Sequence, residues 1–337
     1  MDKIRGVNLG GWFVLEQWMK PTLFEGITDP PDETVFCIKK PDAKKVLEDH
    51  WATFITESDF AYLASLGINS VRLPIPWWYM GEAPYHNSKK WIEHAMGLAA
   101  AHHISVLIDL HTAPGCQNGF DNGGIQGQIN WPKDPKYIQL TVEKLVQITK
   151  DCMKYPSFWG IQVLNEPHWT IDLPFLQDFY EDAYHAIRKV NKEVYIVFHD
   201  GFRPTDGSWE PFFQQHAFDK VVFDLHLYHC FDPKLHQSKI EGHIDLLLNE
   251  RKAMIEQLSK YVKVVVGEWS LGLHAHVLEH EDEFEQHLIL SMLASAQLYA
   301  YEKGFGWYFW SYKIERDNHY GWDFSRLVKS GVMPNKY

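Results

Sequence analysis

The chain has 337 residues, of which 45% are hydrophobic, so it can bury a large core and fits one α/β barrel better than two average domains. Its 44 acidic and 32 basic residues give a formal charge of −12, which argues against phosphate backbones and anionic membrane surfaces as partners. We therefore expect one domain over residues 1–337, with no nucleic-acid partner and no membrane partner.

Short apolar runs recur along the chain at intervals too long for hairpins, and each predicts a strand buried on both faces. In chain order the predicted strands are Gly6–Leu9, Ser70–Ile75, Ser105–Leu110, Gly160–Leu164, Val194–His199, Val221–Tyr228, Val262–Glu268 and Gly306–Trp310. Amphipathic patterns between them predict helices over Glu57–Leu66, Trp91–His102, Tyr137–Met153, Phe175–Val190, Ile244–Tyr261 and Glu281–Tyr301.

Strands that alternate with helices form parallel βα units, and eight strands at this chain length predict a closed (β/α)8 TIM barrel, an α/β fold. An open doubly wound sheet is the alternative. That fold normally has a phosphate-binding GxGxxG loop after the first strand, and Gly10-Gly11-Trp12 does not match it. The sequence therefore favours the barrel.

The segment Pro21–Asp42 is rich in Pro, Asp and Lys and lies between the first predicted strand and the first predicted helix. It is too long for an ordinary connection, so we expect an irregular functional loop packed over one end of the barrel.

Four cysteines are scattered through the chain without CxxC spacing: Cys37, Cys116, Cys152 and Cys230. This pattern predicts free thiols rather than a zinc knuckle or a disulfide scaffold. The motif Gly6–Gly11 follows Met1 too closely for a secretory leader, and no segment has the roughly 18 consecutive apolar residues of a membrane helix. We expect a cytoplasmic protein; a secreted protein whose leader was removed is the alternative.

The active site of such a barrel forms at the C-terminal ends of its strands. The residues at these positions are polar or aromatic: Glu16, Arg72, Asp109, His111, Asn165, Glu166, His226, Tyr228, Glu268 and Trp310. Two buried strands run directly into the acids Glu166 and Glu268. A glycosidase needs two such carboxylates on rigid, separate supports, one to protonate the departing oxygen and one to attack or shield the anomeric carbon.

Each of these residues also has an ordinary structural explanation. Arg72 could be the buried ion-pair partner of Asp109, and the histidines could be core residues with satisfied hydrogen bonds. The Asn-Glu-Pro sequence around Glu166 could be a turn, and Glu268 could be a capping or ion-pair residue. Their joint occurrence at successive strand ends favours function.

Two remote alternatives belong to other classes of protein. A metal-dependent barrel hydrolase would use some of the candidate ligands His111, His226, His229, His274 and His276. Such enzymes typically have His-x-His at the first strand end, where this chain has Asn8-Leu9-Gly10, so we expect no metal. A non-catalytic carbohydrate-binding barrel is the second alternative, and the presence of both acids argues against it.

Seven motifs at the strand ends together resemble glycoside hydrolase family 5, of the retaining clan A. They are Gly6–Trp12, Val71–Pro74, Asp109–His111, Leu164–Pro167, His226–Tyr228, Gly267–Trp269 and Trp307–Trp310, in order over essentially the whole chain. Within the family the likeness is strongest to exo-β-1,3-glucanases. It rests on Phe13–Glu16, Gln117–Asn122, Asp32–Thr34 and Trp51–Phe60.

The resemblance implies that Glu166 is the acid/base and Glu268 the nucleophile of a double displacement. It also implies a set of substrate-binding residues: Glu16, Arg72, His111, Phe120, Asp121, Asn122, Asn165, His226, Tyr228, Phe231 and Trp310. The implied reaction releases glucose from the non-reducing end of a β-glucan oligosaccharide or β-glucoside, without a cofactor. The alternatives within the family are a β-1,4-endoglucanase and a β-glycosidase acting on small or disaccharide glycosides. The sequence points to no protein partner.

These roles carry physical expectations. Glu268 should be ionised beside Arg72 and the Tyr228 hydroxyl, whereas Glu166 should lie in a less polar setting that keeps it protonated. Exo action requires a closed end of the cleft, to which we expect Pro21–Asp42 to contribute.

Three features depart from the exo-β-1,3-glucanase pattern. Cys116 replaces a usual serine, Thr112 replaces a glycine, and the chain is shorter than the fungal members. Shortened loops would open the cleft, so exo and endo action are both retained as expectations.

Overall fold

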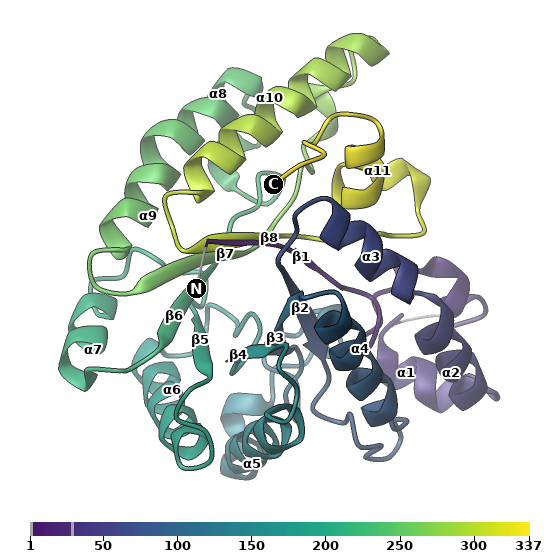
Figure 1. Ribbon diagram of the computed structural model, residues 1–337, viewed down its shortest axis with the longest axis vertical. Coiled ribbons are helices and arrows are strands. Elements are labelled where there is room, and N and C mark those ends of the chain that lie inside the picture. Colours follow the sequence, from purple (N-terminus) through teal and green to yellow (C-terminus); the bar gives the residue numbers. More distant parts are fainter. Residues whose placement is uncertain (1–2, 28–29) are drawn as a thin grey trace.

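A computed structural model describes residues 3–27 and 30–337, and its strands form a closed parallel barrel. In order around the barrel they are β1 (Ile4–Asn8), β2 (Ser70–Ile75), β3 (Ser105–Leu110), β4 (Phe158–Gln162), β5 (Tyr195–His199), β6 (Val221–His226), β7 (Lys263–Trp269) and β8 (Gly306–Phe309). The barrel closes where β8 pairs with β1, with Gly306 opposite Ile4. The predicted TIM barrel is confirmed, and Figure 1 shows its helices arranged around the strands.

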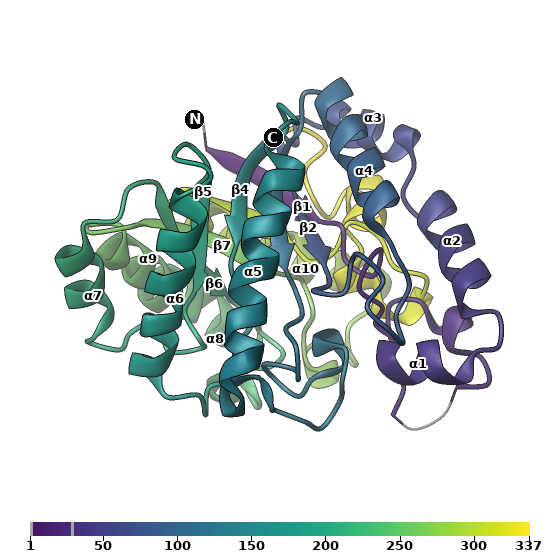
Figure 2. The ribbon, with the colours of Figure 1, turned by 90° about the horizontal axis from the view of Figure 1, so that it is seen from below.

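The predicted helices correspond to α3 (Glu57–Ser65), α4 (Lys89–Ala101), α5 (Pro135–Cys152), α6 (Leu173–Arg188) and α10 (Glu283–Tyr301). Helices α5 and α6 lie side by side on the outside of the barrel (Figure 2).

The helix predicted over Ile244–Tyr261 is interrupted. Helices α8 (Ile240–Asp245) and α9 (Lys252–Leu258) are separated by a π-helical turn, Leu246–Arg251. The N–H of Lys252 donates to the carbonyl of Leu247, five residues back, which is the hydrogen bond that defines a π-helix. An apolar periodicity does not distinguish this turn from regular α-helix.

Two sets of apolar side chains stabilise the barrel. The first set combines strand and helix residues, for example Phe198 of β5 with Phe179 of α6, and it fills the layer between strands and helices. The second set comes from the strands, and because side chains alternate across a strand, it faces the barrel interior. Its buried members are Ile4, Leu107, Trp159, Val197, Val222, Val265 and Tyr308.

Four helices were missed by the sequence analysis: α1 (Glu33–Lys39), α2 (Ala43–Thr53), α7 (Trp209–His216) and α11 (Phe324–Lys329). We expected Pro21–Asp42 to be irregular, which is wrong because the segment contains α1 and the 3-10 turn Pro21–Phe24. Residues 28 and 29 of this segment lie outside the described part of the chain. Helix α1 forms because Asp32 caps it, with Oδ1 accepting from the Val35 N–H at 2.8 Å, and Phe36 is buried.

Smaller differences concern strand ends and thiols. Strand β4 begins and ends two residues earlier than predicted, so Glu166 lies in the loop that follows it, and β6 ends at His226 rather than Tyr228. The four cysteines are free thiols, as predicted. Within the described residues, no helix is both long enough and apolar enough to cross a membrane.

Candidate active site

A cavity of about 1470 Å³ opens at the C-terminal ends of the strands. Ten predicted site residues line it: Glu16, Phe120, Asp121, Asn122, Glu166, His226, Tyr228, Phe231, Glu268 and Trp310. The other three, Arg72, His111 and Asn165, are fully buried beneath these side chains. The structure therefore brings the predicted residues together in one place.

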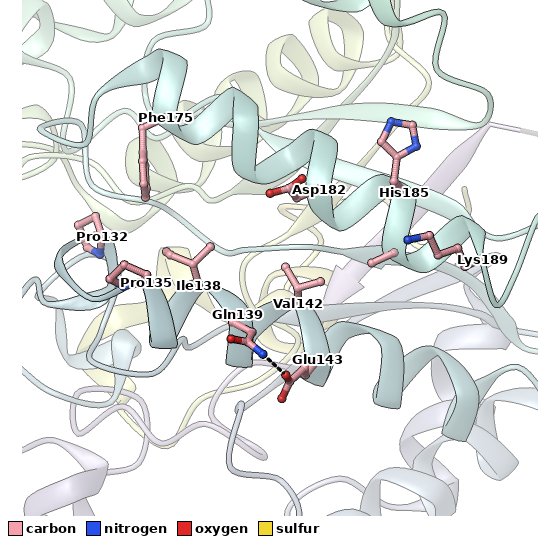
Figure 3. A pocket seen from close by; sticks show the side chains of 11 residues that line it. Pro132, Pro135, Ile138, Gln139, Val142, Glu143, Phe175, Asp182, His185 and Lys189 are labelled. Atoms are coloured by element: carbon pink, nitrogen blue, oxygen red, sulfur yellow. Dashed lines mark hydrogen bonds between the residues drawn. The ribbon is translucent and has the colours of Figure 1, made fainter.

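A second cavity, of about 580 Å³, lies on the outside of the barrel between α5 and α6. Figure 3 shows its side chains, among which Gln139 donates a hydrogen bond to Glu143. It contains none of the predicted site residues, and its lining comes from helix faces and the turn before α5 rather than from strand ends. The cavity with the two strand-end carboxylates is thus the candidate active site.

Arg72 on β2 organises the floor of the site. Its guanidinium donates to Glu268 Oε1 at 2.9 Å and to Asn165 Oδ1 at 2.7 Å, and it pairs with Asp109 Oδ2 at 3.1 Å. His111 Nδ1 lies 2.5 Å from the same Asp109 oxygen. Arg72 is therefore both the structural partner of Asp109 and a direct contact of Glu268.

Glu268, on β7, receives two hydrogen bonds. Besides Arg72 on Oε1, the Tyr228 hydroxyl donates to Oε2 at 2.7 Å. Burial raises the pKa of Glu268, and the neighbouring cations His226 and Arg72 oppose that rise. Both contacts stabilise the ionised carboxylate, which is the form that a nucleophile requires.

His226 connects the two glutamates. Its Nδ1 lies 2.8 Å from Glu166 Oε1 and 3.4 Å from Glu268 Oε2, and its Nε2 lies 3.1 Å from Asp224 Oδ2. Burial alone would lower the pKa of His226, but Glu268, Asp224 and Glu166 hold it well above its usual value. Because one nitrogen contacts both glutamates, their two nearest oxygens are at most about 6.2 Å apart, the total of the two distances.

Glu166 lies in a polar setting, contrary to expectation. Asn122 Nδ2 donates to Oε2 at 2.9 Å, while His226 contacts Oε1. Although burial would raise the pKa of Glu166, His226, His199 and Asn122 lower it to about 2. The expectation of a less polar setting is therefore wrong, and the direction of the shift favours the ionised form of Glu166. The raised pKa of His226 favours a proton on its ring, and Nδ1 of that ring is one hydrogen bond away from Glu166. The backbone of Glu166 is left-handed, with φ of 42°, a strain common at functional sites.

The loops that follow β1 and β8 contact each other at the side of the cavity where Glu16 lies. Glu315 N–H donates to Met19 O at 2.8 Å, and the rings of Trp18 and Trp322 make an edge contact at 5.4 Å. Here Glu16 Oε2 accepts from Trp18 Nε1 at 2.7 Å. Its other oxygen is buried and has no hydrogen-bond partner among the described residues.

The segment Pro21–Asp42 supports this site from behind. None of its described residues lines the cavity, so the expectation that it forms part of the wall is not met. Instead, Glu33 Oε2 accepts from the N–H of Leu15, next to Glu16, at 2.8 Å. Asp32 Oδ2 accepts from the N–H of Gln126 in the loop that carries Asn122.

Aromatic rings border the open side of the cavity. The Phe231 side chain is 68% exposed and packs edge-on against Tyr228 with ring centroids 5.6 Å apart. Phe120 lies 6.1 Å from Trp169, whose ring is 6.0 Å from Phe202. These rings offer flat apolar surfaces of the kind that pack against sugar faces.

Several residues of the lining were not predicted from the sequence. They include Trp18, Trp169, Asp200, Phe202 and Trp322. Asp200 and Phe202 follow the end of β5, a strand end from which no candidate was taken, so the same rule would have found them. Burial raises the pKa of Asp200 to about 7.

Two departures from the family pattern have structural roles. Thr112 Oγ1 accepts from the Trp77 N–H at 3.1 Å. Cys116 Sγ accepts from the Gly119 N–H at 3.2 Å and thus helps to fold the loop that carries Phe120 and Asn122. Neither residue lines the cavity.

The histidines proposed as metal ligands do not assemble in the described part of the chain. The group there that could hold an ion is Glu166, His199 and His226, which includes only one of the five. His111 is hydrogen-bonded to Asp109, and His229 Nδ1 is hydrogen-bonded to His243 Nδ1 at 2.9 Å.

Comparisons with known proteins agree with the geometry. The family model "Cellulase (glycosyl hydrolase family 5)" matches residues 39–316. A probable glucan 1,3-beta-glucosidase A of Emericella nidulans is 33% identical over 375 residues, covering 99% of this chain and 90% of the relative. A glucan 1,3-beta-glucosidase of Candida oleophila is 33% identical over 388 residues, covering 99% and 89%.

Solved structures share the fold. The rutinosidase from Aspergillus niger has a TM-score of 0.81 at 19% identity and covers 98% of each chain. An endoglucanase from Pseudomonas stutzeri in complex with cellobiose has a TM-score of 0.56 at 17% identity, covering 83% of this chain and 84% of that one.

Proposed function

Because the chain belongs to glycoside hydrolase family 5 and is an O-glycoside hydrolase, we propose that it releases single glucose units from the non-reducing end of β-1,3-linked glucans and related β-glucosides. The observation that carries the proposal is the pair Glu166 and Glu268, which meet on one nitrogen of His226 inside the cavity. The relatives named above support the choice of linkage, and the contacts between the β1 and β8 loops beside Glu16 support removal of a terminal residue.

In the first step, Glu268 attacks the anomeric carbon and forms a covalent ester while the leaving oxygen takes a proton from Glu166. Glu166 receives that proton from Nδ1 of His226, 2.8 Å away. As Glu268 becomes an ester it loses its negative charge, which is the largest electrostatic support for the charged form of His226. Bond formation at Glu268 therefore favours proton transfer towards Glu166.

In the second step, water attacks the ester and Glu166 accepts its proton. The Asn122 amide and His226 contact the two Glu166 oxygens and stabilise its ionised form, as a general base requires. Glu268 is released as a carboxylate next to Arg72 and Tyr228.

We expect hydrolysis with retention of the anomeric configuration. Carboxyl groups in retaining enzymes are about 5–5.5 Å apart, whereas inverting enzymes leave about 6.5–9.5 Å for a water molecule. The upper limit of about 6.2 Å between the nearest oxygens fits the first class. Proton NMR of the first product from an aryl β-glucoside should show β-glucose before mutarotation; α-glucose would contradict a double displacement.

The product pattern tests the exo mode. From laminari-oligosaccharides, glucose and a chain one unit shorter should be the first products, because the joined β1 and β8 loops beside Glu16 would stop a glucan chain from extending past that side. A time course by chromatography measures this, with cellulose oligomers and gentiobiose as comparison substrates. An early ladder of intermediate lengths would instead favour an open cleft and endo action.

A further inference from the structure

A largely buried polar network lies beside Tyr228, at the edge of the cavity. At its centre is Arg251, which is only 6% exposed. Its Nη1 donates to the carbonyl of Leu227 at 3.2 Å and its Nη2 to the carbonyl of Tyr228 at 2.5 Å. Nη2 also lies 3.4 Å from Asp232 Oδ2, in the loop that carries Phe231. One guanidinium thus fixes the main chain that directs Tyr228.

The same network reaches the strand that carries Glu268. Arg251 Nη1 donates to the Tyr301 hydroxyl at 3.4 Å, and that hydroxyl donates to Gln297 Oε1 at 3.1 Å. Gln297 Nε2 donates in turn to the carbonyl of Ser270 at 3.0 Å, two residues beyond Glu268. The network therefore ties the main chains on both sides of the Tyr228–Glu268 hydrogen bond to one another.

Arg251 is the last residue of the π-helical turn. Together with Leu247 and Ile255 it occupies the buried face of this helical segment, where an apolar residue is expected. Burying a guanidinium is costly unless its donors are satisfied, and here its partners include the two carbonyls next to the catalytic wall. π-helical turns are frequent at functional sites. The placement indicates a role in the site rather than in the core alone.

We propose that Arg251 is a positioning residue that holds the Tyr228 hydroxyl on Glu268. The inference rests on the proposed function, in which Glu268 is the nucleophile. Tyr228 donates to Glu268 at 2.7 Å, and its direction is set by the carbonyls that Arg251 holds. If the main chain at Tyr228 moved, the hydroxyl would lose this contact, and the carboxylate would lose one of its two stabilising donors.

The test is a double-mutant cycle of Arg251→Met and Tyr228→Phe on an activated aryl β-glucoside. Arg251→Met alone should lower kcat about 10- to 100-fold, because small displacements of reacting groups have effects of this size. The acidic limb of the kcat/KM profile should move to higher pH, since an ionised Glu268 that lacks a donor binds its proton more tightly. In the Tyr228→Phe background, Arg251→Met should change kcat by less than about threefold.

Arg188→Met is the matched control. Arg188 also binds main-chain carbonyls, those of Val194 and Asp219 at 2.8 and 2.7 Å, but it does so before β5 and β6 begin, at the opposite end of the barrel. The Arg188→Met substitution should lower the melting temperature and leave kcat and the pH profile unchanged. Arg251→Lys keeps the charge but not the forked geometry, and it should restore part of the lost kcat.

Equal losses from Arg251→Met in both backgrounds would overturn the inference, as would a fall in melting temperature without a change in the acidic limb. If Arg251→Met does not fold, Tyr301→Phe provides the second measurement. This substitution removes the hydrogen bond from Tyr301 to Gln297. If the acidic limb of the kcat/KM profile did not shift in this variant, the inference would be overturned. A wild-type protein that releases no glucose from β-glucosides would overturn the proposed function instead.

Discussion

Replacing Glu268 with alanine is expected to lower the turnover of β-glucosides by at least about 10⁴-fold, the scale seen when the group that forms a covalent intermediate is removed. The carboxylate held by Arg72 and Tyr228 would be absent, so the first step would have no nucleophile. The measurement is the initial rate with an aryl β-glucoside. Glu302→Ala, a glutamate paired with Arg5, is the control and should retain turnover.

Azide identifies the role of Glu268 more directly than the loss of rate does. In Glu268→Ala the small anion can occupy the vacated space. It can then attack an activated β-glucoside from the face that Glu268 would have attacked, which gives α-glucosyl azide. Recovery of rate together with the α product would support the nucleophile assignment. A β product from this variant would contradict it.

Replacing Glu166 with alanine should have an effect that depends on the leaving group. Turnover of a laminari-oligosaccharide should fall by about 10²- to 10⁴-fold, the range that general acid catalysis supplies. Formation of the covalent intermediate from 2,4-dinitrophenyl β-glucoside should be nearly unchanged, because that leaving group needs no proton. Rapid-mixing measurements of the released phenolate test this.

Azide should also accelerate the Glu166→Ala variant, but here it would attack the covalent intermediate and give β-glucosyl azide. The two variants therefore predict opposite anomers under the same conditions. If Glu166→Ala lost activity equally on activated and unactivated glucosides, or gave the α product, the roles of the two glutamates would have to be exchanged.

Much of the barrel follows from the sequence because the strands are short, apolar runs whose side chains are buried on both faces. The predicted bounds of Ser70–Ile75 and Ser105–Leu110 are those of β2 and β3. The capped helix α1 was missed because the composition around it, rich in Pro, Asp and Lys, suggested a loop. The π-helical turn was missed for a different reason: a single change in hydrogen-bond register leaves no distinct pattern of apolar residues.

The location of the site follows from the same rule, since strand ends meet at one mouth of the barrel. Contacts between residues from different strands cannot be inferred from the sequence of any one strand. The prediction of a less polar setting for Glu166 was wrong because that setting depends on His226, which is 60 residues later in the chain and is brought to 2.8 Å by the fold. The role of Arg251 depends likewise on carbonyl groups, which carry no sequence signal.

The way in which Arg72 is held has a consequence for how this protein can change over evolutionary time. Its guanidinium contacts side chains from several strands, Asn8, Gln162 and Glu268 among them, and none of its surface is exposed. A substitution there would disturb folding and chemistry together. Phe231 and Trp169, by contrast, are more than half exposed and belong to loops. Lineages can therefore acquire new leaving-group preferences by replacing such rim residues, while the bond-breaking apparatus beneath them stays under strict selection.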